Sequence, residues 1–123
     1  MRLLLALLLT AFFTQMLSAQ DGEIEPIYTS WDLLDRGEAS GLDRQLCFAY
    51  IRGFSDGNRW LLRDMPVAVG VGVPHSVCVP NSESISTAAD FFVARFRWRR
   101  DELSDLSPFR ALSMALSGRY PCD

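Results

Sequence analysis

Three cysteines and a single histidine are the residues of this chain with the clearest capacity for chemistry. Cys47, Cys78 and Cys122 follow none of the spacings of zinc or haem sites, and His75 has no partner at metal-ligand spacing. A nucleophilic pair of Cys78 and His75 would need an Asn or Asp to orient the imidazole, and no motif places one. His75 is better explained as a surface residue of a turn. We therefore expect no catalytic residue, no metal and no cofactor, and we expect that the protein is not an enzyme.

The start of the chain has the features of a secretory signal peptide. A positive residue precedes an apolar run over 3–13, and a cleavage site ends at Ala19. The run is shorter than the ~20 apolar residues of a spanning helix, which favours cleavage over a membrane anchor. Residues 1–19 are thus predicted to direct export, 20–28 to form a flexible leader, and 29–123 to form one folded domain. The net charge of −3 gives no reason to expect binding to nucleic acid or to anionic membranes.

The segment 43–63 has a pronounced helical periodicity and is predicted to be the central helix of the domain. Gly53 and Gly57 lie one above the other on it, at a cost of about 1 kcal/mol each relative to alanine. We therefore expect another backbone to approach the helix closely at these glycines. One face of this helix carries residues spaced by three, four and seven, namely Cys47, Tyr50, Ile51, Phe54, Asn58 and Leu61.

Four helices are expected in all, spanning 31–36, 43–63, 85–100 and 108–117. Thr29 or Ser30 is placed to cap the first helix, and Gly37 to end it in the left-handed conformation. Pro108, preceded by a serine, is a strong start signal for the last helix. Valines and glycines alternate in the connector before the third helix, but no second strand is available to pair with them. The chain is therefore predicted to be all-α, a small disulfide-linked bundle of about four helices with an apolar connector between helices 2 and 3.

The arrangement of the last two helices favours one disulfide over the others. Their link is short, so they are expected to form an antiparallel hairpin. Cys78 lies just before this hairpin and Cys122 just after it, which favours a Cys78–Cys122 bond and leaves Cys47 unpaired. Cys47–Cys122 is the competing pairing, because the connector is long enough to place Cys78 elsewhere.

A run of arginines and aromatic residues at the end of the third helix is the first candidate for a protein-binding surface. Arg and Trp are enriched among interface hot spots. Export argues against the nucleic-acid alternative, and a solvated helix end that complements the dipole is the structural alternative. Segment 64–77 is the second candidate, while Tyr50 and Asp56 are expected to have structural roles. The residues of the first candidate are Arg97, Trp98, Arg99, Arg100, Asp101 and Glu102.

Taken in order, these motifs resemble the Rap/Tai family of immunity proteins for type VI secretion amidase effectors, over about residues 31–122. The resemblance implies a small all-α periplasmic protein, often a homodimer, with no association with the membrane after signal cleavage. It implies that the protein binds a peptidoglycan-cleaving amidase toxin and blocks its active-site groove, without activity of its own. The motifs are Asp32-Leu33-Leu34, Cys47-x-x-Tyr50-Ile51-x-Gly53-x-x-Asp56-Gly57, Cys78-x-Pro80 and Tyr120-Pro121-Cys122.

The resemblance also implies that Cys47, Cys78 and Cys122 belong to the family's cysteine framework. Many members have a further cysteine at the end of the first helix, where this chain has Gly37. The residues that contact a toxin vary within the family and do not carry over. The alternative function is that of a small periplasmic stress chaperone, similar in build to the HdeA-type acid chaperones. The 15 Asp and Glu residues of the chain would allow an acid-driven transition of that kind.

Overall fold

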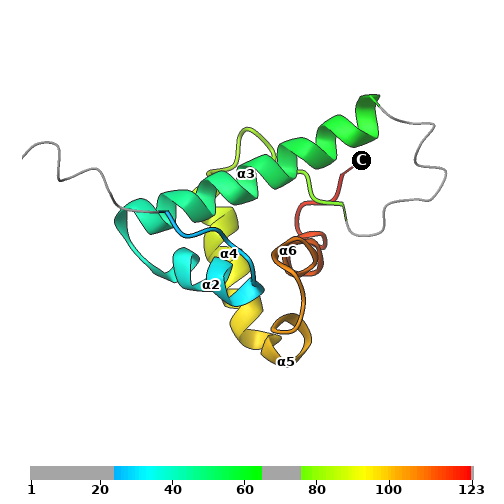
Figure 1. The fold of residues 1–123 in the computed structure, drawn as a ribbon. Helices are drawn as coiled ribbons and strands as arrows, with labels where there is room; N and C mark the ends of the chain where they lie inside the picture. Colours follow the sequence, from blue (N-terminus) through cyan, green and yellow to red (C-terminus); the bar gives the residue numbers. More distant parts are fainter. Residues whose placement is uncertain (1–23, 65–75, 123) are drawn as a thin grey trace, which may run out of the picture.

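The computed structural model describes residues 24–64 and 76–122, and these form an all-α domain. The predicted fold class, a small disulfide-linked helical bundle, is confirmed. A short additional helix, α5, lies within the predicted link between the last two long helices. Neither described range contains a helix long and apolar enough to cross a membrane. The helices, labelled as in Figure 1, are α2 (Ser30–Glu38), α3 (Gly41–Asp64), α4 (Ile85–Trp98), α5 (Arg100–Leu103) and α6 (Pro108–Leu116).

Helix α4 is the element against which all the other described helices pack. Figure 1 shows α3 crossing the top of the molecule and α4 descending from it behind α2, with α6 at its side. Phe92 and Phe96 of α4 are fully buried, with ring centroids 5.9 Å apart. The edge of Trp31 from α2 packs on Phe96 at 5.3 Å. The prediction that 43–63 is the central helix is therefore wrong, since α4 has the side chains that fill the centre of the core.

Side-chain caps fix the starts of α2 and α6. Thr29 caps α2, because its Oγ1 accepts from the amide of Asp32 at 3.1 Å and its own amide donates to the Asp32 carboxylate at 2.8 Å. These hydrogen bonds, the one from the Thr29 backbone above all, lower the pKa of Asp32. Ser30, the other predicted cap, is instead buried and donates to two backbone carbonyls at the end of α5, at 3.1 Å each. Ser107 caps α6, with Pro108 at the first position as predicted.

The prediction that Gly37 ends α2 in a left-handed conformation is wrong. The helix continues to Glu38, and the left-handed glycine is Gly41, with φ 63°. Gly37 is buried, and a Cβ built on it would lie 2.8 Å from Cγ2 of Val93 and 3.4 Å from Sγ of Cys47. Glycine fits here because α2 lies too close to α4 to leave room for a side chain.

The two glycines of α3 also differ from their predicted role. A Cβ at Gly53 or Gly57 would meet no heavy atom within 4 Å, and both residues are exposed. They lie on the side of α3 away from Cys47 and Ile51, which are fully buried. No described backbone approaches them, because the core is formed on the opposite side of the helix.

The predicted apolar connector is described only at its end, since residues 65–75 lie outside the described ranges. Val77 and Val79, which follow, are fully buried in the core. The amide of Val79 donates to Oγ of Ser55 on α3 at 2.7 Å. The end of the connector is thus fastened to α3 by both apolar contact and a buried hydrogen bond.

The preferred disulfide, Cys78–Cys122, is present, with its two Cα atoms 4.9 Å apart. It joins the segment before α4 to the segment after α6. Beside it, the amide of Cys78 donates to the carbonyl of Tyr120 at 2.8 Å, and Val77 and Pro121 form an antiparallel bridge. The bonded cysteines are 44 residues apart. Closing a loop of that length contributes about 4 kcal/mol to stability in loop-entropy theory.

Cys47 is the free thiol, and it is fully buried between α3 and the other helices. The competing Cys47–Cys122 bond is therefore not formed. Burial raises the pKa of the thiol to about 11. At neutral pH the group is protonated, and a protonated buried thiol is chemically inert.

Alanine at Gly53 or Gly57 should raise the free energy of unfolding by about 0.5–1 kcal/mol each, since the added methyl group meets open space and favours the helix. Gly37→Ala is the contrasting variant, because its methyl group would displace Val93 at an overpacking cost of about 1–3 kcal/mol. It should be neutral or destabilising alone and stabilising in a Val93→Ala background. Urea denaturation of the oxidised proteins measures the free energy of unfolding of each variant, with Val93→Ala as the reference for the double variant. Loss of stability in the α3 variants would show that this face is covered in solution.

The buried thiol predicts a decrease in stability at alkaline pH. The unfolded chain loses the Cys47 proton near pH 9 and the folded chain near pH 11, so the free energy of unfolding should fall between these values. The contribution is complete below pH 9 and amounts to about 3 kcal/mol. Denaturation of wild type and Cys47→Ala across this range isolates the contribution of the thiol, because all other groups are common to the two proteins. Parallel pH profiles would contradict the prediction.

Candidate functional site

The predicted binding residues form a helical corner rather than an extended loop. We call residues 97–102 the α4–α5 corner. Arg99 connects the two helices with φ −114° and ψ 36°, and its amide donates to the carbonyl of Arg95 at 2.9 Å. Leu103, at the end of α5, is fully buried, and its carbonyl accepts from the Ser30 hydroxyl. The corner is therefore anchored to the core and to α2 at its base.

The arginines of the corner point in different directions. Nε of Arg97 donates to Glu38 of α2 at 2.7 Å, on one side of α4. Arg99 pairs with Glu102 of α5. The guanidinium of Arg100 lies over the ring of Trp31, 5.5 Å from its centroid. The corner therefore does not form a single cationic cluster, although the run of arginines in the sequence suggested one.

The pair of Arg99 and Glu102 shifts the ionisation of both partners. The hydrogen bond from Arg99 lowers the pKa of the Glu102 carboxyl, and the same bond raises the pKa of the Arg99 guanidinium. Both groups therefore stay charged across the physiological pH range. Asp101, the neighbouring acid, is exposed on α5.

One tryptophan belongs to the corner and another lies beside it, and their surroundings differ. Trp98 is 75% exposed and is stacked under Arg95, whose guanidinium lies 4.8 Å from the ring centroid. Trp31 is 39% exposed and packs its edge on the buried ring of Phe96. An exposed tryptophan held by a neighbouring cation is typical of a binding surface, because a large rigid ring loses little freedom on contact. Trp98 is therefore the first candidate for a contact residue within the corner.

A groove beside the corner was not predicted from the sequence. It lies between α4 and the end of α6, has a volume of about 570 Å³, and includes Arg95 of α4 and Arg99 directly after it, with Met114 and Arg119 from the α6 side. Arg95 and Arg99 are four apart in the sequence, a spacing that places them on one face. The α6 residues have no sequence signal that connects them with α4, so only the packing of the two helices creates the groove.

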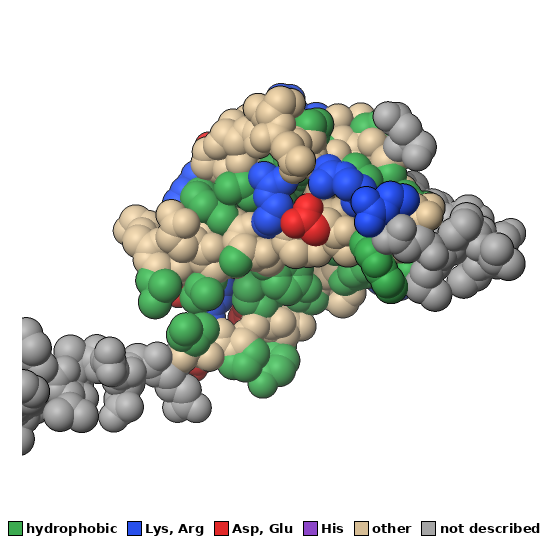
Figure 2. Space-filling view, turned by 90° about the horizontal axis from the view of Figure 1, so that it is seen from above, with side chains coloured by type: hydrophobic (Ala, Val, Ile, Leu, Met, Phe, Trp, Pro, Cys, Tyr) green, Lys and Arg blue, Asp and Glu red, His purple; other side chains and the backbone are tan. Residues whose placement is uncertain are grey.

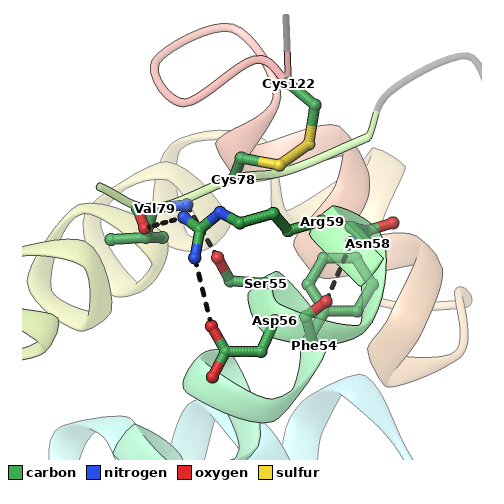
Figure 3. Close-up of polar contacts among 8 residues, drawn as sticks. All are labelled: Phe54, Ser55, Asp56, Asn58, Arg59, Cys78, Val79 and Cys122. Carbon is green, nitrogen blue, oxygen red and sulfur yellow. Dashed lines mark hydrogen bonds and ion pairs between the residues drawn. A yellow bond between two sulfur atoms is a disulfide. The ribbon is translucent and has the colours of Figure 1, made fainter. Parts of the chain in front are cut away.

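The motif residues of α3 have structural contacts, shown in Figure 3. Asp56 pairs with Arg59 at 3.3 Å, and Nη2 of Arg59 donates to the carbonyl of Val79 at 2.7 Å. Nδ2 of Asn58 donates to the carbonyl of Phe54 within the same helix at 3.0 Å. Asp56 thus orients an arginine that holds the chain beside the disulfide, which agrees with its predicted structural role.

Of the remaining motif residues, Tyr50 lies away from this region, beside Ile27 and Leu46, whereas the prolines lie at the disulfide. Tyr50 is half-buried against the core, and burial raises its pKa. Pro80 and Pro121 lie with the disulfide cysteines along a surface hollow of about 520 Å³. Figure 2 views the molecule over α3 and shows arginine side chains beside one acidic side chain, with hydrophobic side chains below them.

The described residues contain no group of three His, Cys, Asp or Glu side chains that could hold a metal ion. Cys78 and Cys122 are bonded to each other in the disulfide, and Cys47 is a buried free thiol. His75 and most of segment 64–77, the second binding candidate, lie outside the described residues. Comparisons of the chain with protein-family models, with curated proteins and with solved structures found no match.

The two tryptophans should respond differently to truncation. Trp31→Ala should lower the free energy of unfolding by about 2–3 kcal/mol, because it removes a ring that packs on the core. Trp98→Ala should change it by less than about 0.5 kcal/mol, since most of that side chain is in solvent. Urea denaturation with tryptophan-independent circular dichroism measures both. Equal losses in the two variants would mean that Trp98 is part of the folded core and not free to bind.

Proposed function

We propose that this chain is a periplasmic immunity protein that binds a secreted peptidoglycan amidase toxin and inhibits it by covering the active-site groove. The observation that carries the proposal is the α4–α5 corner, where Trp98 projects from a helical turn that is fixed at its base. Groups that are ordered before binding lose little conformational freedom in the complex. A pre-ordered corner with an exposed aromatic ring is therefore suited to entering the cleft of a hydrolase.

The surroundings of Gly37 support the resemblance on which the choice of partner depends. The family to which the sequence is similar often has a cysteine at this position. A Cβ on Gly37 would lie 3.4 Å from Sγ of Cys47, which is the free thiol. A cysteine there would be within disulfide reach of Cys47. The arrangement is what we expect of the family's fold with one half of a disulfide missing.

Export to the periplasm is supported by two independent features. The predicted signal peptide over 1–19 directs the chain out of the cytoplasm. The Cys78–Cys122 disulfide is compatible with an oxidising compartment, where such bonds form and persist. The amidase substrate, peptidoglycan, is in the same compartment, so an inhibitor located there would meet the toxin where it acts.

The test is a periplasmic pull-down of the oxidised protein against a panel of type VI amidase effectors, with survival of toxin-expressing cells as the second readout. We expect one amidase to bind at nanomolar affinity, to lose hydrolysis of a muropeptide substrate, and to be neutralised in cells. Trp98→Ala should weaken binding at least tenfold. A double variant with Arg99→Glu and Arg100→Glu should do so as well. Trp60→Ala is the matched control, because it removes another tryptophan, 54% exposed, from α3.

Absence of binding to every amidase in the panel would overturn the proposed function. Binding of apolar dyes and of unfolded client proteins below pH 4 would then favour the chaperone alternative. Binding that is equally weakened by Trp60→Ala and Trp98→Ala would keep an amidase partner but remove the α4–α5 corner as its contact surface.

A further inference from the structure

The groove between α4 and the end of α6 is lined by three arginines together with two large apolar side chains. Arg95 and Arg99 lie on its α4 side, and Arg119 lies where the chain leaves α6. Phe91 and Met114 supply apolar surface between them, and no carboxylate is among the groove's lining residues. The groove therefore offers cationic donors and apolar contact area at the same place.

Each of the three guanidinium groups is held in position by its own neighbours. Arg95 lies over Trp98, and Arg119 lies over Phe91 with its carbon 5.0 Å from the ring centroid. Nε of Arg119 also donates to the Tyr120 hydroxyl at 3.0 Å, and its Nη2 forms an ion pair with Oε1 of Glu83 at 3.6 Å, outside the groove lining. Arg99 uses Nη2 for its pair with Glu102. A guanidinium has five N–H donors, so these contacts orient the groups and leave donors for a ligand.

The spacing of the α4 arginines fits an extended polypeptide. Positions four apart on a helix are separated by about 6 Å along its axis. Alternate side chains of an extended chain are separated by about 6.6–6.8 Å and lie on one side of it. Two carboxylates at alternate positions would therefore meet Arg95 and Arg99, while the side chain between them would face Met114 on the other wall.

We propose that this groove binds an extended acidic segment of a protein partner, with carboxylates at alternate positions and an apolar residue between them. A volume of about 570 Å³ is larger than one inorganic anion requires, and such an anion would leave the apolar lining residues Phe91 and Met114 without contact. Methionine can adapt its shape to different apolar side chains. That the partner is the toxin rests on the proposed function. The acidic and apolar character of the segment is inferred from the lining of the groove alone.

The test uses a fluorescein-labelled Glu-Leu-Glu-Leu-Glu peptide and the oxidised protein, with fluorescence anisotropy as readout. We expect saturable binding that is at least tenfold weaker for a Gln-Leu-Gln-Leu-Gln peptide. Arg95→Glu and Met114→Glu should each weaken binding of the acidic peptide at least tenfold, with circular dichroism confirming that the variants fold. Arg63→Glu is the matched control, since it makes the same charge change at the far end of α3.

Any of these results of the peptide assay would overturn the inference: no saturable binding, equal binding of the two peptides, unchanged binding to Arg95→Glu, or loss of binding only in Arg63→Glu. The last would place the peptide in the hollow beside the disulfide. Preferential binding to phosphatidylglycerol vesicles over the peptide would also overturn it, in favour of a membrane surface. The peptide assay contains no toxin, so its failure is distinct from failure of the amidase panel.

Discussion

Burial of Phe92 and Phe96 along one face of α4 is the interaction on which the rest of the structure depends. The two rings are fully buried, and α4 packs against every other described helix. Burying two phenylalanine side chains contributes about 3–6 kcal/mol relative to exposing them. That is a large share of the stability of a domain of this size, for which the net value is typically about 5–15 kcal/mol. The positions of α2, α3 and α6 all follow from how each covers this face.

Polar contacts and the disulfide then fix the segments that the core does not order by itself. Ser55 and Arg59 of α3 bond to the amide and carbonyl of Val79, so both backbone groups of that residue are satisfied. The Cys78–Cys122 bond ties the adjoining residue to the end of the chain, as Figure 3 shows. Elsewhere in the molecule, the Ser30 hydroxyl of α2 donates to the carbonyl of Leu103 and so holds the end of α5. Each contact joins segments that are far apart in the sequence.

The same helix that fills the core also presents the proposed binding groups. Phe92 and Phe96 face inward, whereas Phe91, Arg95 and Trp98 recur at spacings of four and three on another face. This division places the α4–α5 corner and the groove next to each other on one rigid element. A partner that inserts against Trp98 can therefore contact the groove without any rearrangement of the fold.

The sequence by itself determined the features that depend on local chemistry. The helix starts at Thr29 and Ser107 follow from cap residues, and the Cys78–Cys122 pairing follows from a short antiparallel link between the helices they flank. Helix periodicity was sufficient for the all-α class, because each main helix has an apolar face of the expected spacing.

Only the tertiary structure decided features that depend on what lies opposite a residue. Gly37 is needed because Val93 faces it, whereas a Cβ at Gly53 or Gly57 would meet no heavy atom within 4 Å, which reverses the roles predicted from the sequence. The arginines at the end of α4 diverge because their carboxylate and aromatic partners come from α2 and α5. The groove exists only because α6 returns alongside α4. Local propensity has no information on such contacts, since most of them join residues of different helices that are far apart in the chain.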